Sequence, residues 1–99
     1  MDLQQVVWKH VISIGGTDTI YFPPSARVTM TRVDPLNSEM VLYWVAHPEP
    51  GELDPDAFKE NQATFEIIGT GQAFPLDWEV VGSCADPNRP LVWHLVRHA

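Results

Sequence analysis

The chain has 99 residues, 44% of them hydrophobic and 19% charged, which is typical of one folded domain with one modest core. Its net charge of −7, from 13 acidic residues against six Lys and Arg, argues against general binding to nucleic acids or anionic membranes, because both need a concentrated basic surface. The single cysteine, the lack of a signal-peptide pattern and the lack of a long apolar run predict a soluble protein of a reducing cytoplasm, without disulfides.

Seven segments have the pattern of β-strands, each bounded by turn residues. Nine Pro and six Gly recur along the chain and leave little room for a helix of ordinary length. The segment 39–47 is apolar at both odd-numbered and even-numbered positions, so both faces of the strand would be buried, which predicts the central strand of a sheet. The predicted strands span residues 6–14, 19–22, 26–33, 39–47, 63–69, 77–83 and 91–98.

Short strands at this spacing predict an all-β fold, a small antiparallel β-sandwich or a partly open barrel of about seven strands. We expect one domain over residues 1–99. A domain of this size leaves edge strands unpaired, and such edges can join subunits into a homo-oligomer.

The segment 48–61 is the least strand-like part of the chain and carries five acidic residues. We interpret it as a solvated acidic loop, because runs of like charge are usually solvent-exposed. Calcium binding is the sharper alternative, but the acids lack the spacing of a known calcium-binding loop. The segment is also a candidate contact with a protein partner. The residues concerned are Glu49, Glu52, Asp54, Asp56 and Glu60.

The stretch Gly69-Thr70-Gly71 raises the question of a phosphate-binding loop. Such a loop needs glycines that lead into a helix N-terminus, whereas Gln72 and Pro75 here lead towards another strand. The pattern therefore favours the turn of a β-hairpin. The alternative is a binding loop, in which exposed N–H groups, the Thr70 hydroxyl and the Gln72 amide contact a ligand.

The histidines and possible nucleophiles do not form a recognisable catalytic or metal site. His94 and His98 share one face of a strand about 13 Å apart, too far to chelate one ion. His94 lies in an apolar row, which favours a hydrogen-bonded core residue over a ligand-binding or catalytic one. Ser83 and Cys84 follow a glycine without the nucleophile-elbow pattern. We predict no catalytic residue, no metal and no cofactor.

Four fragments in this order resemble a family of short, uncharacterised proteins found widely in bacteriophage and bacterial genomes. Members often have His after Gly-Thr-Gly and a tighter Leu-Trp-Ala in the middle, so Gln72 and Tyr43 depart from the pattern. The resemblance implies a phage or prophage setting and no established activity. The fragments are Val7-Trp8-Lys9, Leu42-Tyr43-Trp44-Val45-Ala46, Ile68-Gly69-Thr70-Gly71 and Val92-Trp93-His94-Leu95.

The function we expect is that of a small, non-enzymatic phage accessory protein that binds a target in the host cytoplasm and counteracts host defence. In one version it sequesters a small anionic, nucleotide-like molecule in an oligomer. Tryptophan would then stack on the base, a cation would pair with the phosphate, and the 69–72 loop would supply N–H groups. The ligand-binding candidates are Trp8, Lys9, Trp44, Gly69, Thr70, Gly71, Gln72, Trp93, His94 and Arg97.

In the second version the acidic loop and an edge strand block a host protein. Two other classes stay open: a minor structural component of the virion, and a hydrolase that uses His94.

Overall fold

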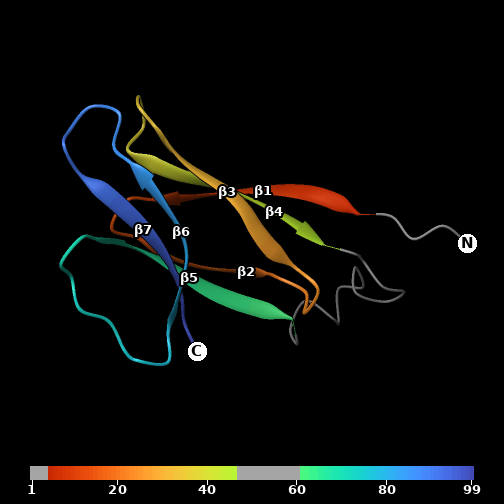
Figure 1. Ribbon diagram of the computed structural model, residues 1–99. Helices are drawn as coiled ribbons and strands as arrows, with labels where there is room; N and C mark the ends of the chain where they lie inside the picture. The colour runs from red at the N-terminus through yellow and green to blue at the C-terminus, as the bar shows by residue number, and fades with distance from the viewer. Residues whose placement is uncertain (1–4, 47–60) are drawn as a thin grey trace, which may run out of the picture.

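The computed structural model describes residues 5–46 and 61–99, so the acidic residues of segment 49–60 lie outside the described residues. Within them, seven strands and no helix form two antiparallel sheets that pack face to face (Figure 1). This confirms the all-β sandwich prediction, and the sheets do not close into a barrel. The strands are β1 (Val6–Ser13), β2 (Thr17–Tyr21), β3 (Arg27–Asp34), β4 (Glu39–Ala46), β5 (Gln62–Gly69), β6 (Glu79–Ala85) and β7 (Val92–Arg97).

The first sheet has the strand order β1-β4-β3, so the apolar segment 39–46 is its central strand, as predicted. Alternation places Met40, Leu42 and Trp44 towards the second sheet. Val41 and Val45 point to the outer face, yet both are buried, because strands on either side flank them.

The second sheet has the order β2-β5-β7-β6, which corrects the prediction of a hairpin at residues 69–75. Thr70 and Gly71 do form a tight turn, in which Gly71 has a φ of 91°. However, β7 pairs with both β5 and β6, so the chain crosses β7 through residues 70–78 before β6 begins. The turn residues were recognised correctly, but they lead into a crossing connection because β7 takes the place beside β5.

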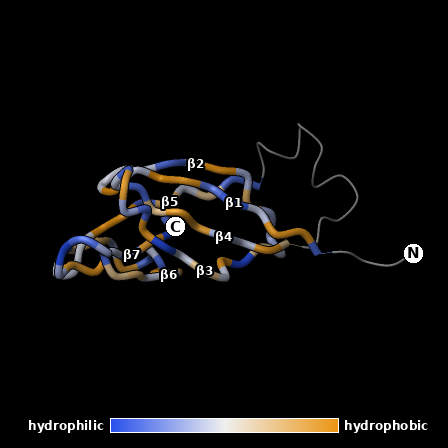
Figure 2. Tube along the Cα trace, turned by 90° about the horizontal axis from the view of Figure 1, so that it is seen from above, coloured by the Kyte–Doolittle hydropathy of each residue, from blue (hydrophilic) through white to orange (hydrophobic). Residues whose placement is uncertain are grey.

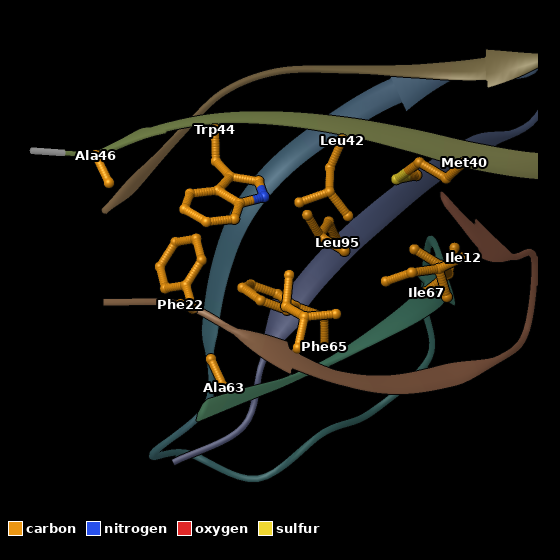
Figure 3. Close-up of a cluster of buried hydrophobic side chains, with 11 residues drawn as sticks. Ile12, Phe22, Met40, Leu42, Trp44, Ala46, Ala63, Phe65, Ile67 and Leu95 are labelled. Carbon is orange, nitrogen blue, oxygen red and sulfur yellow. The ribbon is translucent and has the colours of Figure 1, made fainter. Parts of the chain in front are cut away.

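The core lies between the two sheets and is built from alternate residues along strands of both sheets (Figure 3). Phe22 follows β2 and contacts the rings of Trp44 and Phe65, both at centroid distances of 5.2 Å. The largest fully buried side chains are Met40, Leu42, Phe65, Ile67, Leu95 and Val96.

The sandwich has two sides where edge strands of different sheets face one another. Figure 2 shows β1 and β2 on one side, and β3 and β6 on the other. The β3–β6 side is held together where the Thr31 hydroxyl donates to the Ser83 carbonyl at 3.2 Å. On the β1–β2 side, a His10–Asp18 contact of 2.7 Å joins the sheets. Clefts beside these contacts are the places where a ligand can enter.

Candidate functional site

A cleft of about 380 Å³ opens on the β1–β2 side of the sandwich. Its volume falls at the lower end of the roughly 300–1,000 Å³ of small-molecule sites, which suits one ring system with a polar substituent. Strands from both sheets build its walls, so its shape depends on how the sheets pack. The lining residues are Trp8, Lys9, His10, Thr19, Ile20, Tyr21 and Trp44.

Two tryptophans form the aromatic wall of this cleft. Trp8 and Trp44 are register partners on β1 and β4, and their rings stack at 5.7 Å with an interplanar angle of 17°. Trp44 is 5% exposed and rests on Phe22, whereas Trp8 is 37% exposed. The buried ring therefore fixes the exposed one, which gives a flat ligand a pre-organised surface.

Polar groups lie beside the aromatic wall. His10 Nε2 is 2.7 Å from the Asp18 Oδ2 atom, and both side chains are partly exposed. Lys9 makes no ion pair with another described residue. Lys9 directly follows Trp8 and pairs with Tyr43, so alternation turns its side chain to the outer face of the first sheet, opposite to Trp8.

The Gly-Thr-Gly turn lies at the opposite end of the molecule from this cleft. Thr19 to Tyr21 pair with Thr64 to Gln62 at the start of β5, whereas the turn follows Gly69 at its end, about 20 Å away along the strand. Within the turn, the Gln72 N–H donates to the Gly69 carbonyl, and the Gly69 N–H donates to the Gln72 side chain. Two of its backbone donors are therefore already used by the turn itself.

His94 connects this turn to the neighbouring strand. Its Nε2 atom is 2.9 Å from the Thr70 hydroxyl and its Nδ1 atom is 2.7 Å from the Ser83 hydroxyl. The Thr70 hydroxyl also lies 3.3 Å from the Val92 carbonyl. Because both ring nitrogens have hydroxyl partners, His94 is a hydrogen-bonded residue, and no carboxylate orients it as in a catalytic triad.

Trp93 belongs to a separate network that the sequence did not indicate. Its indole N–H donates to Asp86, which is 9% exposed and also binds Arg89 and the Asn88 backbone N–H. These hydrogen bonds, the one from Trp93 foremost, lower the pKa of the Asp86 carboxyl. A groove of about 290 Å³ lies beside Trp93 and the Gly69–Thr70 turn. Among the described residues, no cation lines this groove, although the Arg89 guanidinium lies over the Trp93 ring, 5.8 Å from its centroid.

The ten predicted ligand-binding residues thus divide among three places. Trp8 and Trp44 meet in the β1–β2 cleft, and Lys9 also lines it, although its side chain alternates to the other face of β1. The 69–72 turn lies with Trp93 and His94 at the far end of β5, and Arg97 lines a cleft on the β3–β6 side. His10, Thr19, Ile20 and Tyr21 were missed as lining residues. His10 shares its strand face with Trp8, which could have indicated it, but Tyr21 comes from the other sheet.

Metal-ligand groups and the free cysteine were the other features of interest in the described residues. None of them form a group of three or more His, Cys, Asp or Glu side chains that could hold a metal ion. Burial raises the pKa of the Cys84 thiol, which disfavours the reactive thiolate. In residues 5–46 and 61–99 there is no helix with the length and apolar character to span a membrane.

The fold and the cleft define a small two-sheet protein with an aromatic-walled cleft. The chain belongs to the family described as "Domain of unknown function (DUF7352)", whose pattern matches residues 3–99. Neither a curated protein nor a solved structure matches this chain.

Proposed function

We propose that this protein is a non-enzymatic binding protein that holds a small aromatic anion, nucleotide-like in its chemistry, in the β1–β2 cleft. The observation that carries the proposal is the stacked Trp8–Trp44 pair, of which one ring is buried and the other faces the cleft. Stacking of a base on an aromatic side chain contributes about 1–3 kcal/mol and does not depend on which base is bound.

The anionic part of this proposal comes from the sequence pattern, in which Lys9 follows Trp8; in the fold Lys9 alternates to the outer face of β1, so its ammonium reaches a ligand in the cleft only around the strand edge. His10 adds a ring that can donate or accept, and its contact with Asp18 fixes its position. The net charge of −7 opposes long nucleic acids but leaves room for one local anion.

The biological setting rests on the resemblance to phage and bacterial proteins. In that setting we propose an accessory factor of the host cytoplasm that removes a small signal molecule and thereby counteracts host defence. Sequestration needs tight binding without turnover, and a pre-organised stacking surface without a catalytic triad is consistent with that role.

Native mass spectrometry of the protein purified gently from cells tests the proposal first. We expect additional mass of a few hundred daltons for each cleft, the size expected of a small molecule that fills it. The four ribonucleoside monophosphates are then titrated while tryptophan fluorescence is followed. Trp8→Ala should weaken binding roughly 5- to 150-fold, the equivalent of one stacking contact.

Two further variants sharpen this test. Lys9→Gln should weaken binding and reduce its salt dependence, because one ion pair with the ligand is lost. Met30→Ala is the matched control, since Met30 is 52% exposed on another strand and does not line the cleft. A protein without bound mass, and without affinity for any of the four nucleotides, would overturn the proposal.

A further inference from the structure

His10 and Asp18 face one another across the gap between the two sheets. Their register partners on β4 and β5, Leu42 and Phe65 respectively, are both fully buried in the core. The two side chains therefore point inward from the edge strands β1 and β2, and His10 Nε2 lies 2.7 Å from Asp18 Oδ2. The other carboxylate oxygen, Oδ1, accepts a hydrogen bond from the Thr19 N–H at 2.9 Å. Asp18 is thus held through both oxygens, and it holds the His10 ring in turn.

This contact determines which nitrogen of His10 carries a proton. An ionised carboxylate only accepts hydrogen bonds, so the Nε2 atom donates, and in the neutral ring the Nδ1 atom is then an acceptor. Nδ1 makes no hydrogen bond to another described residue. It is also open to solvent, because the fully buried side-chain polar atoms without a partner in the described chain belong to Trp44 and His98. His10 therefore offers an accessible acceptor.

The His10 ring lies beside the aromatic wall of the tryptophan cleft. Trp8 and His10 are two residues apart on β1, so their side chains share one face of the strand, roughly 7 Å apart. Both side chains line the cleft. The Thr19 hydroxyl, from the other sheet, is already paired with the Thr64 hydroxyl at 2.8 Å. A flat ring stacked on Trp8 can therefore bring its polar edge to His10.

We propose that His10 Nδ1 accepts a hydrogen bond from an amino group on the ring of the ligand, so that the cleft selects amino-bearing bases such as adenine and cytosine. This inference rests on the function proposed above and names the class of base. A carbonyl oxygen in the same place would face the lone pair of Nδ1 and lie near the negative charge of Asp18, which disfavours it. His10 is therefore the specificity-determining residue, and Asp18 is its positioning residue.

Matched pairs of nucleotides test this proposal. Cytidine and uridine monophosphates differ by an amino or a carbonyl group, whereas adenosine and purine riboside monophosphates differ by an amino group or a hydrogen atom. Titrations followed by tryptophan fluorescence should show that the amino-bearing member of each pair binds more tightly, by roughly 2- to 12-fold, the value of one neutral hydrogen bond. Equal or inverted affinities in either pair would overturn this inference and leave the proposed function standing. No affinity for any of the nucleotides would overturn both.

Three variants assign the preference to these residues. His10→Phe keeps a ring of similar size without the acceptor, so the preference within each pair should disappear. Asp18→Asn should reduce it, because an amide can donate as well as accept and no longer keeps the proton on Nε2. Trp8→Phe is the matched control, since a smaller stacking ring should weaken both members of a pair alike and leave their ratio unchanged. A preference that survives in His10→Phe would overturn the proposal.

Nitrogen chemical shifts of the His10 ring give a readout in the wild-type protein, whether or not the variants fold. In mildly alkaline buffer, where an imidazole is generally neutral, we expect the proton on Nε2. The Nδ1 signal should then shift with cytidine monophosphate more than with uridine monophosphate. A proton on Nδ1 in the free protein, or equal shifts with the two nucleotides, would overturn the proposal.

Discussion

Asp86 illustrates how single residues hold the end of this sandwich in place. Its side chain accepts hydrogen bonds from the Trp93 indole, the Asn88 backbone and two nitrogens of Arg89, at 2.8 to 3.2 Å. Asn88 in turn donates to the Pro35 carbonyl in the β3–β4 turn. The 86–90 loop is therefore tied to both sheets, and the ionised carboxylate is the centre of this network.

This network predicts an acid-sensitive component of stability. Because the hydrogen bonds lower the pKa of Asp86 in the folded state, the stabilisation is present above the pKa of the unfolded chain. It is lost as the pH falls through the folded-state pKa, where the carboxylate is protonated. Asp86→Asn should melt below wild type at neutral pH, and the difference should narrow in strong acid. Thermal melts of both proteins across acid pH measure it, and an unchanged difference would contradict the account.

At the scale of elements, β6 of the second sheet lies close against β3 of the first sheet at Gly82. A Cβ atom added there would lie 2.7 Å from Thr31 Cγ2 of β3, closer than van der Waals contact allows. Thr31 cannot simply rotate away, because its hydroxyl donates to the Ser83 carbonyl. Glycine at 82 is therefore required by sheet packing.

A double-mutant cycle tests this contact. Gly82→Ala should lower the free energy of unfolding by about 1–3 kcal/mol, the usual cost of overpacking. In a Thr31→Ser background, which removes Cγ2 and keeps the hydroxyl, the same change should cost less by about 1 kcal/mol. Urea denaturation of the four proteins gives the coupling. Additive effects would show that the Gly82 requirement does not arise from Thr31.

The strands could be predicted from the sequence because their signals are local. Alternation and turn residues identified all seven strands of the described chain to within a few residues. The position of β7 between β5 and β6 could not be predicted, because it depends on pairing between segments far apart in the sequence. The same limit applies to the site. Trp8 and Trp44 were recognised as candidates, but the place of Tyr21 in the lining of the same cleft and the separate location of Arg97 follow from how the sheets pack.

At the scale of the whole molecule, the four edge strands differ in how well they could pair with a second copy. β3 has a register irregularity between Val28 and Met30, and β6 has one between Val80 and Gly82. Such bulges make an edge strand less able to pair with another chain. β2 has only five residues. β1 pairs with β4 in unbroken register over eight residues, which leaves β1 as the regular edge.

The backbone groups that β1 offers to a partner follow from its pairing with β4. The Ile14 N–H donates to the Ser38 carbonyl, which continues the β1–β4 register. Because hydrogen-bonded pairs alternate in an antiparallel ladder, even-numbered residues of β1 bond to β4. The odd-numbered residues Val7, Lys9 and Val11 then present their N–H and C=O groups to the open side, whereas the Ser13 carbonyl accepts from the Gly16 N–H.

We therefore predict a symmetric dimer in which two β1 strands pair antiparallel, placing the second copy beside the tryptophan cleft. Val11→Pro should give a folded monomer, since Val11 N–H is an outward donor and its loss removes no bond to β4. His10→Pro is the contrast, because it removes a bond within the sheet and should destabilise the fold. Native mass spectrometry distinguishes these states from the 11.2 kDa chain mass. A wild-type monomer, or a Val11→Pro dimer, would show that β1 is not the interface.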